Sequence, residues 1–71
     1  MMGNHDLYAG LHQQYRQATG ITQATWDLIQ VTVWEQGIPA TRERASRWLE
    51  AVNHDAVRRA LTDFLRLTEG A

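Results

Sequence analysis

Five arginines lie in the segment from Trp34 to Leu61, and their surroundings are suited to hydrogen bonding with nucleic acid. Arg58 and Arg59 follow closely after Asn53 and His54. An arginine can form two hydrogen bonds to a guanine, and an asparagine can do the same with an adenine. If these residues open a helix, that helix could read base edges in the major groove, with Arg58 exposed on its outer face.

Three further arginines, Arg42, Arg44 and Arg47, precede this group by about one helix length. Basic side chains on the first helix of a helix-turn-helix contact phosphates, which positions the protein without reading sequence. The two sets together predict a unit of two helices over residues 41–67, with double-stranded DNA as the partner.

The same arginines have a second explanation, in which they only keep an exposed helix soluble. Glu43 and Arg47 are four residues apart in the order that favours an ion pair, and so are Asp55 and Arg59. Arg59 also precedes Asp63 by four residues. The arginines without such a neighbour are therefore the better evidence for a function, and they are Arg42, Arg44 and Arg58.

The charge balance is close to neutral and counts against a free-standing nucleic-acid binder. Seven arginines face eight acidic residues in 71, and no lysine occurs, which gives a formal charge of −1. Six of the arginines lie in residues 38–71. Because phosphate neutralisation supplies most non-specific affinity for DNA, such proteins are usually more basic than this chain.

Apolar periodicity predicts four helices, over residues 6–18, 22–36, 41–52 and 53–67. Thr22, Thr41 and Asn53 are residue types that cap helix N-termini, and Asn4 could cap the first helix. Gly20 is expected to end the first helix. Gly37 fits the left-handed position after the second helix, and Pro39 prevents continuation of that helix. The predicted fold is a single all-α domain over residues 1–71, a compact three- to four-helix bundle with a helix-turn-helix-like unit.

The apolar stripes of these helices define a predicted core. The segment VTVW could also form a strand, but a lone strand would have no partner, so a helix is expected. Trp26, Trp34 and Trp48 lie on or beside the stripes, and all three are expected to be mostly buried. An exposed Trp34 would instead indicate a protein-binding surface. The stripes comprise Leu7, Leu11, Ala18, Trp26, Ile29, Val33, Ala45, Trp48, Leu49, Val52, Val57, Ala60, Leu61, Phe64 and Leu65.

The run GIPATRERASRWLEAVNHDAVRRALTDF resembles the N-terminal helix-turn-helix of plasmid-type replication-region DNA-binding regulators. The shared features are Gly37, Pro39 and Thr41 around the turn, and Val57 and Arg58 near the start of the last helix. The match covers residues 21–67 at the level of spacing. The chain has AVNHD where the family has a turn containing glycine and serine, and it lacks the family's long coiled-coil tail. The resemblance implies sequence-specific DNA binding and repression, with Asn53 and Arg58 in reading positions.

No set of residues has the spacing of a catalytic or metal site. The chain has no cysteine, and its single serine, Ser46, has no histidine beside it. His5 and His12 are seven residues apart and lack a third ligand at a recognisable spacing. We therefore expect a non-enzyme with no metal and no cofactor. No segment has the character of a signal peptide or a membrane span, which predicts a cytoplasmic protein with no membrane partner.

Two functions follow from these observations. The first is a small transcription regulator that binds DNA as a homodimer, with Tyr8, Leu11 and Tyr15 at the dimer surface; packing within the monomer explains those residues equally well. The second is a phage-type small inhibitor that binds a host protein complex, such as RNA polymerase or a defence nuclease, without touching DNA. Exposed aromatics would dominate such a contact, and the candidates are Tyr8, Tyr15 and Trp34.

Overall fold

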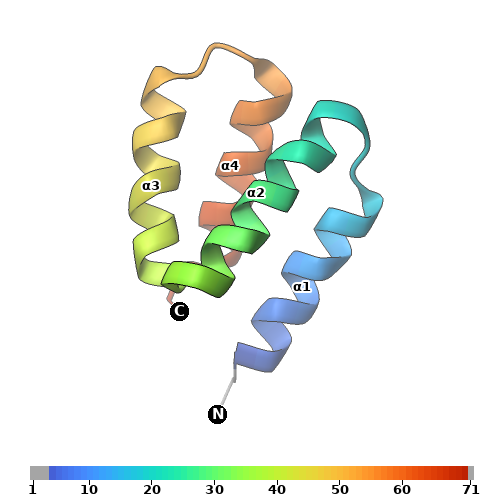
Figure 1. Cartoon of the computed structure of the whole chain (residues 1–71), viewed down its shortest axis with the longest axis vertical. Helices are drawn as coiled ribbons and strands as arrows, with labels where there is room; N and C mark the ends of the chain where they lie inside the picture. Colours follow the sequence, from blue (N-terminus) through green and yellow to red (C-terminus); the bar gives the residue numbers. More distant parts are fainter. Residues whose placement is uncertain (1–3, 71) are drawn as a thin grey trace.

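The computed structural model describes residues 4–70, and the side chains of residues 8–70. The four helices are α1 (Asn4–Gln17), α2 (Gly20–Gln36), α3 (Ile38–Ala51) and α4 (Asp55–Leu67). Consecutive helices run in opposite directions, as Figure 1 shows. The prediction of an all-α bundle is confirmed, and VTVW lies within α2. None of these helices is long and apolar enough to cross a membrane.

The helices α2, α3 and α4 all pack against one another, and α1 packs against α2 and α4. All the buried apolar residues except Ile38 lie on the apolar stripes predicted from helical periodicity, and Phe64 and Leu61 are completely buried. Burial of large side chains from several helices is what holds a bundle of this size together. The buried apolar residues are Leu11, Trp26, Ile29, Val33, Ile38, Ala45, Val57, Ala60, Leu61 and Phe64.

The predicted helix starts are wrong by several residues at three places. The second helix is preceded by Thr19 rather than Thr22, and Gly20 begins this helix instead of ending the first. The third helix begins at Ile38 rather than at Thr41. The fourth begins at Asp55, so that His54 and not Asn53 occupies the N-cap position, without a side-chain hydrogen bond.

A threonine explains one of these errors, because its hydroxyl bonds backward within the helix instead of capping it. The Thr41 hydroxyl donates to the Gly37 carbonyl over 2.7 Å. Burial of Ile38 favours the earlier start of α3. Asn4 is the first residue of α1, but the side chains of Asn4, His5 and Leu7 lie outside the described residues.

Gly37 joins α2 to α3 in a backbone conformation that suits only glycine. Its φ of 88° and ψ of 168° have the predicted positive φ but differ from the left-handed helical region. Its N–H donates to the Val33 carbonyl over 2.9 Å, which ends α2. Pro39 then lies in the first turn of α3, where its missing N–H leaves no hydrogen bond unmade.

Candidate interaction surface

Arg58, the expected base-reading residue, is exposed at the start of α4 but bonds to the end of α3. Its Nη1 donates to the Leu49 carbonyl over 2.7 Å and to the Val52 carbonyl over 3.0 Å. The last carbonyls of a helix have no hydrogen-bond partner within the helix. A cation at this end is also attracted by the partial negative charge of the helix dipole. Arg58 therefore caps the C-terminus of α3.

Arg42, an expected phosphate contact, has the corresponding role at the other end of the α3–α4 pair. Its half-buried Nη1 donates to the Leu65 carbonyl over 2.7 Å and to the Thr68 hydroxyl. Thr68 is only 1% exposed, and its hydroxyl donates in turn to the Phe64 carbonyl over 2.9 Å. Arg42 therefore closes the C-terminus of α4.

Arg47 forms the predicted ion pair with Glu43, with 2.6 Å between Nη2 and Oε1. The two other predicted pairs, Asp55 with Arg59 and Arg59 with Asp63, are not within ion-pair distance. The bridge between Arg47 and Glu43 is the only one among residues 8–70. Because both of its side chains are well exposed, it contributes little to stability.

The remaining residues of the predicted DNA-binding set do not share one hollow of the surface. Arg44 borders a groove between α2 and α3, whereas Arg59 borders a hollow formed by α1, α2 and α4. Asn53 and His54 are exposed in the connection between α3 and α4. Figure 1 shows α3 and α4 side by side and antiparallel, as in a helical hairpin.

The three tryptophans have three different environments. Trp26 is 2% exposed and belongs to the core, and Trp48 is half-buried against it. Trp34 is 83% exposed at the end of α2. The expectation that Trp34 is mostly buried is therefore wrong. An exposed Trp34 instead indicates a protein-binding surface.

Trp34 belongs to a row of exposed apolar side chains along α2, which we call the α2 outer face. Its members recur at intervals of three or four residues, so they lie on one side of the helix. Two acidic residues, Asp27 and Glu35, are exposed on the same helix. α2 therefore carries apolar side chains on its exposed side as well as on its buried side, whereas a surface helix normally keeps its apolar stripe toward the core. The α2 outer face consists of Ile21, Ala24, Leu28, Val31 and Trp34.

A groove between α1 and α2 runs beside Trp34, with a volume of about 300 Å³ and a mainly apolar lining. Tyr8 contributes from α1, and Gln30 and Val33 contribute from α2. Leu11 forms the buried floor, and Tyr15 packs against the core next to His12. The predicted contact surface on the first helix is therefore reduced to Tyr8, which is 40% exposed.

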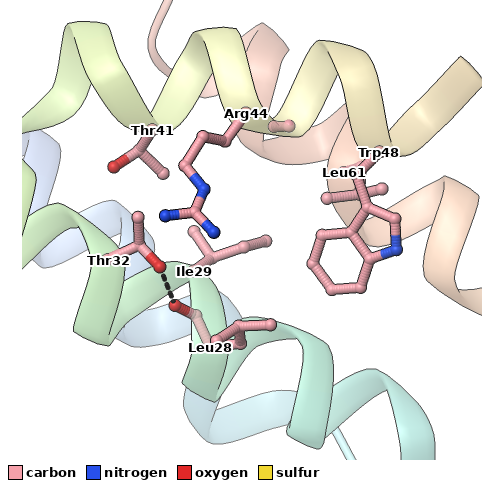
Figure 2. Close-up of a pocket in the computed structure, with 8 residues that line it drawn as sticks. Leu28, Ile29, Thr32, Thr41, Arg44, Trp48 and Leu61 are labelled. Atoms are coloured by element: carbon pink, nitrogen blue, oxygen red, sulfur yellow. Dashed lines mark hydrogen bonds between the residues drawn. The ribbon is translucent and has the colours of Figure 1, made fainter.

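A second groove, of about 210 Å³, lies on the opposite edge of the α2 outer face, between α2 and α3. Leu28 and Thr32 line it from α2, and Arg44 and Trp48 line it from α3. Figure 2 shows the Arg44 guanidinium extending from α3 toward α2, with the Trp48 ring farther along the same groove. No described residue accepts a hydrogen bond or an ion pair from Arg44.

The sequence carries a signal for this surface. Leu28, Val31 and Trp34 add apolar side chains to α2 beyond those that one packed face requires. The groove residues Thr32 and Trp48 could not be paired from sequence, because they come from different helices.

The described residues contain no group of three histidine, aspartate or glutamate side chains placed to hold a metal ion. What the surface offers is apolar area, two exposed acids and one arginine without a partner. No family model, curated protein or solved structure matches this chain.

Proposed function

We propose that this chain is a protein-binding module that contacts its partner through the α2 outer face, with Trp34 as the main anchor. The observation that carries the proposal is the 83% exposure of Trp34 at the end of a row of exposed apolar side chains. Single apolar residues on a surface are common, but a continuous row along one helix marks an interaction site.

The composition of the surface supports a protein as the partner. Tryptophan and tyrosine are enriched among the residues that dominate the binding energy of protein interfaces. Trp34 and Tyr8 border one groove, and the aliphatic residues Leu28 and Val31 continue the surface along α2. The form anticipated from the sequence, a small inhibitor of a host complex such as RNA polymerase, needs no catalytic residue and is consistent with this surface.

The DNA-binding alternative has less support among the described residues. Arg42 and Arg58 donate to carbonyls at the ends of the α3–α4 hairpin, and Arg47 pairs with Glu43. A regulator that used these side chains on DNA would have to release those bonds first. The transcription-regulator function therefore stays a prediction from the sequence.

Site-specific photocrosslinking in the cells that produce the protein tests the proposal. A benzophenone amino acid in place of Val31 places the reactive group on the α2 outer face, and the same substitution at Glu50, exposed on α3, is the control. We expect a protein adduct from position 31 that disappears when Trp34→Ala is added, and none from position 50. Absence of any adduct from position 31, or one unaffected by Trp34→Ala, would contradict the proposal.

A further inference from the structure

We infer that the occupant of the α2 outer face is a second copy of this chain, whose Trp34 enters the groove between α2 and α3. The inference rests on the proposed function, because it assigns a partner to the same surface. It goes further by naming the partner, the receiving groove and the symmetry of the contact.

The α2 outer face has one edge beside α1 and another beside α3, and the two edges are complementary in shape. Trp34 projects along the edge beside α1, together with Gln30 and Val33. The groove lies along the other edge, beside α3. One edge therefore carries an exposed tryptophan, and the other carries an opening.

The groove has a suitable size and lining for an indole ring. Its volume is about 210 Å³, and it is open to solvent. Leu28 and Trp48 supply apolar walls, and Leu61 lies at the buried end. Arg44 is placed to lie over the face of an inserted ring, which is the arrangement of a cation–π contact.

The charges of the two edges are also complementary. Asp27 is seven residues before Trp34, two turns along the helix on the same edge. Asp27 and Arg44 are both exposed, and neither forms an ion pair among the described residues. Contact between two copies would place the Asp27 edge of each opposite the Arg44 edge of the other, so that the two edges attract each other, with Arg44 near the level of Thr32 rather than that of Asp27.

A twofold axis parallel to α2 produces this contact. Such an axis sets the two α2 helices parallel and face to face, and it exchanges the edge beside α1 with the edge beside α3. In a twofold dimer the same patch is used on both subunits, so both tryptophans are inserted at once. Helical side chains lean toward the N-terminus, so Trp34 points toward the level of Thr32.

The area that such a dimer needs is within reach of this protein. A specific interface buries about 800 Å² per partner, which is about one sixth of the 5013 Å² surface of the chain. The 17 residues of α2 extend about 25 Å, and the grooves on both sides widen the contact. An interface of this size favours a concentration-dependent dimer rather than an obligate one.

Sedimentation equilibrium over a wide concentration range measures the association directly. We expect the mass to rise from 8.1 kDa toward twice that value. Trp34→Ala and Arg44→Glu should each weaken dimerisation at least tenfold, because one removes the inserted ring and the other sets like charges opposite each other. The double variant Asp27→Arg/Arg44→Glu should recover most of the loss. Arg66→Glu, a charge reversal at an exposed position of α4, is the matched control and should leave dimerisation unchanged.

Disulfide crosslinking tests the orientation, since the chain has no cysteine of its own. Ala24→Cys and Val31→Cys lie along the middle of the α2 outer face, two turns apart. Parallel helices bring each of these positions near its own copy, within the Cα separation of about 4–7 Å that a disulfide spans. Both variants should therefore crosslink to themselves, and Ser46→Cys on exposed α3 should not.

The outcomes separate this inference from the proposed function. A wild-type chain that stays at 8.1 kDa at every concentration overturns the second copy as the partner, even if photocrosslinking from position 31 captures another protein. A dimer that is indifferent to both Trp34→Ala and Arg44→Glu overturns the assigned contact. Crosslinking of only one of the two cysteine variants overturns the parallel arrangement.

Discussion

Arg42 and Arg58 cap each other's helices. Arg42, on α3, donates to the last turn of α4, and Arg58, on α4, donates to the last turn of α3. The antiparallel course of the two helices makes this exchange possible, because the first turns of each lie beside the last turns of the other (Figure 1). Two residues with the sequence character of DNA contacts thus close a helical hairpin.

Arg58→Ala should lower the stability of the fold by about 1 kcal/mol. The substitution leaves the Leu49 and Val52 carbonyls without their charged donor, but these groups are near water, so the loss is smaller than at a buried site. Urea unfolding followed by circular dichroism measures the change. Arg66→Ala, with no hydrogen bond from its side chain among the described residues, is the control and should be nearly neutral. Equal stability of the two variants would remove the capping role.

Arg42 and Thr68 should be energetically coupled. In a double-mutant cycle with Arg42→Ala and Thr68→Val, we expect a coupling energy of about 1 kcal/mol, because the buried hydroxyl accepts the arginine's hydrogen bond. Thr62→Val is the matched control, since its exposed hydroxyl bonds only within α4. Additive effects of Arg42→Ala and Thr68→Val would contradict the contact.

Gly37→Ala should destabilise the protein by about 1–3 kcal/mol, because a side chain is strained at this backbone conformation. Gly10→Ala is the contrasting change. Gly10 lies inside α1, and its new Cβ would make an ordinary contact of 3.9 Å with Leu67 Cδ2 of α4, so the change should stabilise by about 0.5–1 kcal/mol. Thermal unfolding of both variants tests the opposite signs, and a shift in the same direction would show that the strain argument is incorrect.

Trp34→Ala should leave stability within about 0.5 kcal/mol of the wild type, because the side chain is almost free of contacts within the monomer. Trp26→Ala should lower it by about 3–5 kcal/mol, since it empties part of the core. Chemical unfolding at low protein concentration, where association is minimal, compares them. A large loss for Trp34→Ala would assign that ring to folding rather than to binding.

Labelled duplex DNA should show no salt-sensitive binding to this chain. Fluorescence anisotropy at about 50 and 200 mM salt would detect phosphate neutralisation as a steep difference in affinity. We expect flat titrations at both concentrations, given the net charge of −1 and the internal bonds of Arg42 and Arg58. A salt-dependent rise that Arg44→Ala weakens would favour the DNA-binding regulator instead.

The four helices and most of the core could be predicted from the sequence, because a helix that is buried on one side has apolar residues at intervals of three or four. Leu11, Trp26, Ile29 and Phe64 all follow that pattern and are buried. The helix starts were harder to predict, since a threonine before an apolar stripe has two uses for its hydroxyl. Thr41 bonds back to Gly37, and only the position of Ile38 in the core reveals the earlier start.

The candidate site could be predicted only in part. The sequence indicates Tyr8 and Trp34 as aromatics that matter if exposed, but α2 has apolar residues on two sides, and its sequence does not specify which of the two faces water. The roles of Arg42 and Arg58 depend on contacts 23 and 9 residues away along the chain. Contacts between residues so far apart leave no periodic pattern in the sequence. The sequence alone therefore suggests ion pairs or DNA contacts for these arginines.

The exchanged caps make the α3–α4 hairpin a single cooperative folding unit. Helices normally fray from their ends, each independently of its neighbours. Here the last turn of either helix is held by a side chain from the first turns of the other, so unwinding one end withdraws support from the opposite helix. We therefore expect the two helices to open together as one foldon. Its loop closes only three residues between Ala51 and Asp55, so this unit also has the low contact order of a fast-forming nucleus.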